Sequence, residues 1–405
     1  MLHVRPGYLP RTSLGVVLAL GHLVGCHSAS PESEGQLLVE QRGDTVVATN
    51  PASPVPPIDT AGVEVIFQSD DLEEPVGLVR VGSRLVIGDR TRIHFLDSGG
   101  DYLFSSGRSG EGPGEFRSIV AIGVRADSVL ILDSRLMRLS VLDSMGVYAR
   151  SVRLRPRLPF VSPRRGAWRL RSLNDAVLYE VEELVQADRP TRVALVLQQL
   201  AMDSVELIQA WEDILWTNAQ GIMIPAELFR PRAIVSVGSD GRYAFGDGLE
   251  YCVTLAQVRS SRITRICREW ERAPVVDEVR APNLSRFGDP RALDDLNRKA
   301  LQVTFEHQSI GDHWLAYDQV ILDEIGRLWV RRIGADQAGT HPHLWYYFPE
   351  ARPSYYGWDV FEPDGRIGRT VMFPGHFQPR LIQEAEALGI AELDSGELTI
   401  ARAVW

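Results

Sequence analysis

Short apolar runs separated by polar turn residues recur along the chain from about residue 62 to its end. The runs are rich in β-branched residues and are bounded by Gly, Asp, Ser and Pro, which is typical of strands joined by tight turns. Two of the turns, Ser239-Asp240-Gly241 and Glu324-Ile325-Gly326, contain a glycine that tolerates the positive φ such hairpins need. The pattern therefore predicts an all-β protein.

Two segments repeat each other within this pattern. Arg92–Leu103 (RIHFLDSGGDYL) aligns with Arg138–Ala149 (RLSVLDSMGVYA) at an offset of 46 residues. Upstream, a weaker pattern of two apolar strands around a polar turn ends at Asp89, at Asp133 and again at Asp247. The repeating unit is a meander of four antiparallel strands in about 45 residues, the size of one blade of a β-propeller.

The repeats predict a six-bladed β-propeller over 62–405. Its blades are expected near 74–104, 119–153, 167–211, 231–270, 316–372 and 380–405. The last of these has only three strands, whereas a spare strand, Val63–Asp70, begins the body. We expect this strand to complete the final blade and close the ring, because closure removes an open sheet edge.

The segment GRSGEGPGEF connects the first two predicted blades. Its notable residues are Gly107, Gly110, Gly112, Pro113, Gly114, Glu115 and Phe116. The context argues against a phosphate-binding loop, because such loops lead from a strand into a helix, whereas here a strand follows and no lysine is nearby. We interpret the segment as a blade connector.

The connector and the hairpin after it resemble the NHL-type repeat of six-bladed propellers. The resemblance is good over residues 107–149 and fair over 74–103, and it extends to bacterial propeller lipoproteins and secreted proteins. It implies that Phe116 packs between two blades and that Glu115 accepts hydrogen bonds from backbone N–H groups.

The amino-terminal segment has the features of a bacterial export signal. Arg5 and Arg11 precede an apolar stretch, Ser13–Gly25, that is too short to span a membrane comfortably. The following Leu-Val-Gly-Cys resembles a lipobox, which implies cleavage after residue 25 and acylation of Cys26 as the membrane anchor. An ordinary secretory signal with a chance cysteine is the alternative.

The expected location is accordingly the bacterial cell envelope, at the outer membrane or the periplasmic side if the cell has two membranes. Residues 26–61 are rich in Ser and Pro and predict a flexible tether. The net charge of −10 argues against nucleic acid as a main partner, and we expect a monomer.

Two features interrupt the regular strand pattern of the later blades. Residues 289–306 have a helical apolar periodicity after Asp289-Pro290, a helix start signal, and predict an inserted helix that covers an apolar edge or shapes a pocket. Cys252 and Cys267 would lie opposite each other in a hairpin centred between residues 259 and 260. An exported protein permits a disulfide there, but two buried thiols fit the sequence as well.

Candidate chemistry is sparse, and no catalytic residue is assigned. His341 and His343 flank a proline and would point the same way from an extended backbone, which makes them weak candidates for a divalent metal site. An arginine-rich run over 150–171 and an aromatic run over 344–358 suit a ligand surface or ordinary packing and solvation.

Two function classes follow from this sequence. The first is a membrane-anchored, non-catalytic propeller that binds a peptide, glycan or partner protein on one face. The second is a propeller enzyme, a lyase or lactone hydrolase, with a divalent metal in the central channel. The resemblance includes such enzymes, but they depend on His and carboxylate ligands repeated on inner strands, a series that we do not find here. We therefore favour binding and predict no cofactor.

Overall fold

A computed structural model describes residues 36–405 apart from several gaps. The gaps are 155–159, 164–169, 184, 187, 202–203, 220–221, 226, 229–231, 276–298, 300–302, 304–305, 307–308 and 334–352. The predicted signal peptide, Cys26, His341 and His343 lie outside the described residues.

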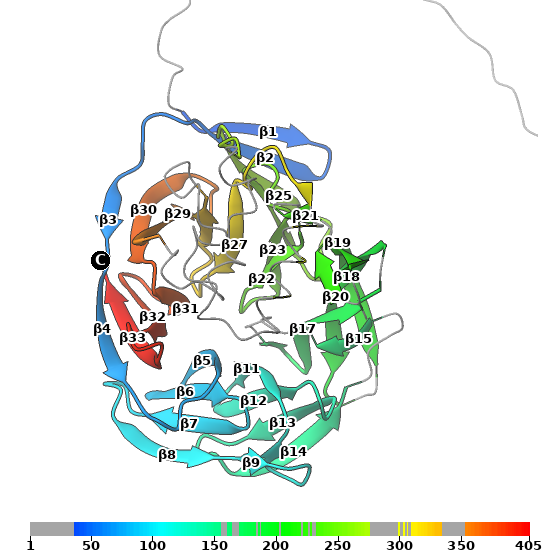
Figure 1. Ribbon diagram of the computed structural model, residues 1–405, viewed down its shortest axis with the longest axis vertical. Coiled ribbons are helices and arrows are strands. Elements are labelled where there is room, and N and C mark those ends of the chain that lie inside the picture. Colours follow the sequence, from blue (N-terminus) through cyan, green and yellow to red (C-terminus); the bar gives the residue numbers. More distant parts are fainter. Residues whose placement is uncertain are drawn as a thin grey trace, which may run out of the picture. The chain divides into compact units, whose positions relative to one another are not determined.

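The described residues form six blades of a propeller, each built on antiparallel strands, as the repeats predict (Figure 1). Blade 1 consists of β5 (Pro75–Val81), β6 (Arg84–Asp89), β7 (Arg92–Leu96) and β8 (Tyr102–Ser106). Blade 2 consists of β11 (Ile119–Arg125), β12 (Ser128–Asp133), β13 (Arg138–Leu142) and β14 (Tyr148–Arg153). In blade 3, β15 (Phe160–Pro163) and β16 (Arg171–Leu173) both pair with β17 (Ala176–Glu183), and β18 (Arg189–Gln199), β19 (Val205–Ala219) and β20 (Ile222–Pro225) follow.

Blades 4 to 6 each gain strands from the amino-terminal part of the chain. Blade 4 is β22 (Ile234–Val237), β23 (Arg242–Gly246), β24 (Cys252–Gln257) and β25 (Ile263–Arg268), extended by β2 (Thr45–Asn50) and β1 (Leu38–Arg42). Blade 5 is β27 (Tyr317–Leu322), β28 (Leu328–Arg332), β29 (Tyr355–Phe361) and β30 (Ile367–Pro374), extended by β3 (Ile58–Thr60). Blade 6 is β31 (Phe377–Ile382), β32 (Glu386–Glu392), β33 (Leu398–Val404) and β4 (Gly62–Phe67). Two short parallel pairs, β9 (Arg108–Ser109) with β10 (Glu115–Phe116) and β21 (Glu227–Leu228) with β26 (Ser309–Ile310), connect elements between blades.

The ring closes through the spare strand that the sequence predicts. β4 is the outer strand of blade 6 and pairs antiparallel with β33, with Val63 opposite Ala403. Blade 6 therefore combines one strand from the amino-terminal part of the chain with the last three strands, and its backbone hydrogen-bonding groups have partners that three strands alone would not provide.

The expected tether differs from the structure over residues 38–61. β2 pairs in parallel with β25, and β3 pairs in parallel with β30, so this stretch adds strands to blades 4 and 5 before β4 joins blade 6. Asn50 is buried between these two blades. Its Nδ2 donates to the carbonyl oxygens of Cys267 (3.1 Å) and Gly365 (2.8 Å), and its Oδ1 accepts from Ile367 N–H at 2.8 Å.

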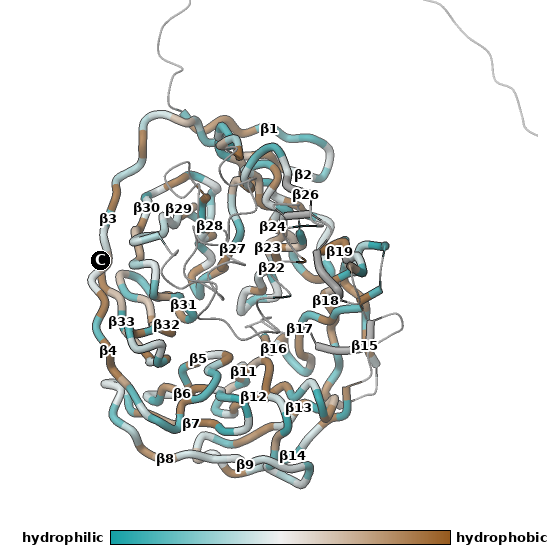
Figure 2. The backbone as a smooth tube through the Cα atoms, viewed as in Figure 1, coloured by the Kyte–Doolittle hydropathy of each residue, from teal (hydrophilic) through white to brown (hydrophobic). Residues whose placement is uncertain are grey.

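The hydrophobic core consists of layers between blades, which the face of one sheet makes with the face of the next. Six clusters of buried apolar side chains each combine residues of two neighbouring blades, and together they complete the ring. Along the chain, hydrophobic and hydrophilic stretches alternate accordingly (Figure 2). Sheets that are buried on both faces in this way cannot fold singly, so the stability of each blade depends on its neighbours.

Carboxylates fix the hairpins that made the repeat visible in the sequence. Asp97 Oδ1 accepts from the N–H groups of Gly99 (2.8 Å) and Gly100 (2.9 Å), and Asp143 Oδ1 accepts from Met145 (2.8 Å) in the equivalent turn. Side chains of this kind mimic a backbone turn, which explains why Leu-Asp-Ser precedes the glycine in both copies.

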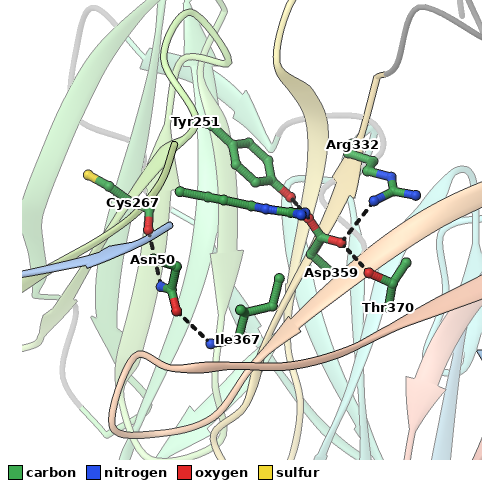
Figure 3. A network of polar contacts seen from close by, with 8 residues as sticks. Asn50, Tyr251, Cys267, Arg332, Asp359, Ile367 and Thr370 are labelled. Carbon is green, nitrogen blue, oxygen red and sulfur yellow. Dashed lines mark hydrogen bonds and ion pairs between the residues drawn. The ribbon is translucent and has the colours of Figure 1, made fainter. Parts of the chain in front are cut away.

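A buried polar network joins blades 4 and 5 (Figure 3). Asp359 is fully buried and accepts hydrogen bonds from Tyr251 Oη (2.5 Å) and Thr370 Oγ1 (2.6 Å). It also pairs with Arg268, and Arg332 Nη1 lies 3.5 Å away. Neighbouring arginines therefore balance the charge of Asp359, and both of its carboxylate oxygens accept hydrogen bonds from protein groups.

The inserted helix falls largely in a gap, but three residues of the predicted range are described. Lys299, Val303 and Glu306 are helical, and Val303 is buried against Ala219. Across the described ranges, no helix has the length and apolarity needed to cross a bilayer.

Candidate functional site

A pocket lies where the first strands of the six blades converge at one end of the ring. Its volume is about 210 Å³, and its lining draws on every blade: Leu78, Val79, Arg80, Ile122, Val124, Leu170, Arg171, Ser172, Ser239, Glu324, Arg380 and Leu381. Ser239 lies in the turn after β22 and Glu324 in the turn after β27. The pocket, which we call the axial pocket, therefore opens at the end of the channel where first strands turn into second strands.

Three arginines and one glutamate give the axial pocket a formal charge of +2 in a chain whose net charge is −10. Arg80 Nη2 lies 3.8 Å from Glu386 Oε1, at the long end of ion-pair distances. Arg380 Nη2 donates to Gln378 Oε1 at 2.9 Å, and Arg171 Nε donates to the carbonyl oxygen of Val237 at 3.2 Å. Each of the three arginines is mostly buried but retains some solvent exposure.

Arg171 and Glu324 interact through space without forming an ion pair. Burial lowers the pKa of the Arg171 guanidinium, and the negative charge of Glu324 offsets part of that effect. Within the described part of the chain, no carboxylate lies within ion-pair distance of Arg171. A cation that is desolvated and incompletely neutralised in this way favours a negatively charged group beside it.

The predicted connector residues lie elsewhere, between blades 1 and 2. Phe116 is fully buried in the apolar cluster shared by these blades. Glu115 Oε2 accepts from the N–H of Gly112 at 2.8 Å and its Oε1 accepts from Arg108, and these two bonds lower the pKa of the Glu115 carboxyl.

The glycines of the connector allow its tight path. A side chain at Gly107 would contact the Phe116 ring within 2.8 Å, and one at Gly110 would overlap the Glu115 carboxylate. Gly112, Pro113 and Gly114 form the turn between these contacts. The connector thus has a structural role, because the Glu115 carboxylate and the Phe116 ring both contact other parts of the protein.

The two body cysteines lie directly opposite each other in the register of β24 and β25, and a disulfide joins them. The neighbouring residues Tyr251 and Arg268 are the ones that reach Asp359. The cross-link therefore joins β24 and β25 next to the two blade 4 residues that contact Asp359.

The remaining sequence candidates are distributed over several parts of the fold. In the aromatic run, Tyr356 and Trp358 are buried in the core between blades 5 and 6, which is a packing role. Of the arginine-rich run, Arg171 reaches the axial pocket. Within the described ranges, no three His, Cys, Asp or Glu side chains converge as a metal ion would require.

Sequence reasoning did not identify the axial pocket. Arg80 and Arg380 each occupy the first strand of a blade within an apolar sequence, LVRV and PRLI. A charged residue in an otherwise apolar strand indicates that this side chain faces a channel or pocket. Once the blades were assigned, this pattern could have pointed to the axial pocket.

The fold and the pocket define a six-bladed propeller with an arginine-lined axial pocket. The fold is also found in a solved structure of another protein. A member of the DUF4221 family from Bacteroides vulgatus aligns with a TM-score of 0.52 at 10% identity, covering 92% of this chain and 98% of that one. A predicted exported protein from Bacteroides fragilis aligns at 0.47 with 11% identity, covering 86% and 98%. The calcium-binding protein regucalcin from Agrobacterium tumefaciens aligns at 0.39 with 11% identity, covering 86% and 95%.

No family model matches the sequence, and no curated protein matches it.

Proposed function

We propose that this protein is a non-catalytic binding propeller of the bacterial cell envelope that receives part of a peptide, glycan or protein ligand in its axial pocket. The observation that carries the proposal is the convergence of all six blades on one pocket. Concave sites of this kind, with an apolar lining and a few convergent polar groups, are the usual ligand sites of proteins.

The size of the pocket limits what can enter it. A volume of about 210 Å³ is below the range of roughly 300–1,000 Å³ typical of sites that enclose a drug-sized ligand. A larger ligand would therefore insert one protruding group and rest its remainder on the surrounding turns, where Ile325 is exposed.

Blocking the pocket tests this function. Ser239→Trp places a large side chain in an exposed turn at the pocket, and Ser395→Trp does the same in an exposed turn of blade 6 outside the pocket lining. Saturation-transfer NMR would be run with a panel of small neutral, cationic and anionic compounds of amino-acid size. We expect compounds that bind the wild-type protein and Ser395→Trp but not Ser239→Trp. Equal binding to all three proteins, or no binding by any compound, would refute the proposal.

Anchoring in the envelope is the second part of the proposal, and it rests on the lipobox-like sequence that ends at Cys26. We expect the wild-type chain to fractionate with membranes and a Cys26→Ala variant to lose this association. Intact-mass analysis would show acyl groups on the wild-type chain only. A wild-type protein that is already soluble and unmodified would contradict the anchor and leave the binding proposal untouched.

A further inference from the structure

The axial pocket has a chemical character more specific than a general ligand site. Its three guanidinium groups favour a negatively charged group, and arginine binds carboxylates through paired N–H donors. Among the residues that the structure describes, no carboxylate lies within ion-pair distance of Arg171. An anion in the pocket would supply this missing partner.

The lining also selects against a bare inorganic anion. Half of the twelve lining residues are apolar: Leu78, Val79, Ile122, Val124, Leu170 and Leu381. Apolar surface gains from contact with an apolar substituent, at roughly 25 cal/mol per Å² removed from water, and phosphate or sulfate offers none. The ligand group should therefore carry a short apolar side chain next to its charge.

Glu324 adds a third requirement. It is exposed at the mouth of the pocket, near enough to influence Arg171 but not paired with it. A carboxylate accepts hydrogen bonds and donates none when ionised, so it calls for an N–H donor on the ligand. It would also repel a doubly charged anion more strongly than a singly charged one.

The volume of the axial pocket sets the size of the group that it can hold. About 210 Å³ corresponds to roughly seven water molecules at about 30 Å³ each, which is the space of one amino-acid residue.

We propose that the axial pocket binds an α-carboxylate flanked by an apolar side chain and an N–H group, the chemistry of the carboxyl-terminal residue of a peptide. The arginines bind the carboxylate, Glu324 accepts the N–H, and the apolar lining contacts the side chain. A free apolar amino acid offers the same groups and is the second source of this chemistry. This inference rests on the proposed function, because it assumes that the axial pocket is where ligand binds.

Isothermal titration calorimetry on the full chain in detergent tests the inference with four probes. N-acetyl-L-leucine represents a peptide end, L-leucine the free amino acid, N-acetyl-L-leucinamide the same body without the carboxylate, and inorganic phosphate the bare anion. We expect the amide and phosphate to bind at least tenfold more weakly than N-acetyl-L-leucine, because charged hydrogen bonds are lost in one case and apolar contact in the other. Tighter binding of N-acetyl-L-leucine than of L-leucine assigns a peptide end, and the reverse order assigns the free amino acid.

Two variants locate the interaction. Arg171→Met should weaken the binding of N-acetyl-L-leucine by about tenfold to a hundredfold, whereas Arg366→Met, in an exposed turn of blade 5, should leave it unchanged. The comparison of acid and amide on the wild-type chain needs no variant, so the test stands even if Arg171→Met folds poorly.

The outcomes separate the two proposals. Equal affinity for the acid and the amide, or phosphate binding as tight as that of the acid, would overturn the carboxylate assignment. If panel compounds still bound the pocket in a manner that Ser239→Trp abolishes, the proposed function would survive that result. If nothing bound there, both proposals would fall.

Discussion

Removing the charge of Asp359 should destabilise the ring more than almost any other single change. Asp359→Asn keeps the size of the side chain but leaves Arg268, whose side chain is 4% exposed, without its negative partner. The new amide nitrogen would also face donors, because Tyr251 and Thr370 both donate to this carboxylate. Loss of one member of a buried ion pair costs about 3–5 kcal/mol.

Urea denaturation followed by circular dichroism measures this cost. For a slope of roughly 4 kcal/mol per molar, taken as that of a larger single-unit protein, the midpoint should fall by about 1 M. Asp59→Asn is the control, because Asp59 pairs with Arg369 at 3.4 Å on the partly exposed edge of the same blade. A surface pair of this kind contributes about 0–1 kcal/mol.

A second substitution tests whether the unpaired charge of Arg268 causes this loss of stability. Adding Arg268→Met to Asp359→Asn removes the uncompensated charge, so the double variant should lose less stability than the sum of the two single variants. Additive losses, or an Asp359→Asn midpoint equal to that of Asp59→Asn, would refute the idea that the unpaired buried charge is the cause.

Three further changes test other parts of the fold. Phe116→Ala should cost about 3–5 kcal/mol in urea denaturation, because the ring is fully buried between blades 1 and 2, and a loss under 1 kcal/mol would contradict that packing role. Non-reducing mass spectrometry should find Cys252 and Cys267 joined, and replacing both by serine should cost about 3 kcal/mol for a sequence separation of 15 residues, whereas two alkylatable thiols would exclude the disulfide. Burial raises the pKa of Tyr179 and of Tyr317, so the stability linked to each phenol is present below about pH 10, the ordinary value, and is lost as the pH rises above it. The free energy of unfolding from urea denaturation should therefore fall at alkaline pH by about 1.4 kcal/mol per pH unit for each tyrosine, and Tyr179→Phe should reduce this slope; an unchanged slope would contradict the assignment.

The blades were predictable because their signals are local. The aspartates at 97 and 143 fix turns within five residues of themselves, and the apolar strands beside them can be read without knowing the rest of the fold. The closing strand was also predictable, since a blade with three strands and a strand without a blade imply each other.

The amino-terminal strands were not predictable, because the strands that they pair with lie far away in the sequence. Residues 38–61 have the composition of a tether, and only pairing with β25 and β30, over 200 residues away in sequence, makes them strands. The axial pocket was unpredictable for the same reason, because its residues are distant in the sequence. Arg80, Arg171 and Arg380 are separated by about 90 and 210 residues, and only the closed ring brings them to one place.

The route of residues 38–67 around blades 4, 5 and 6 determines when the ring can form. A ribosome makes these strands first, but their partners β25, β30 and β33 follow in that order, and the last of them ends at Val404. Blade 6 therefore stays incomplete until the final strand has been synthesised. The closed ring can therefore form only after β33 has left the ribosome, so the topology itself makes ring closure a late step of folding.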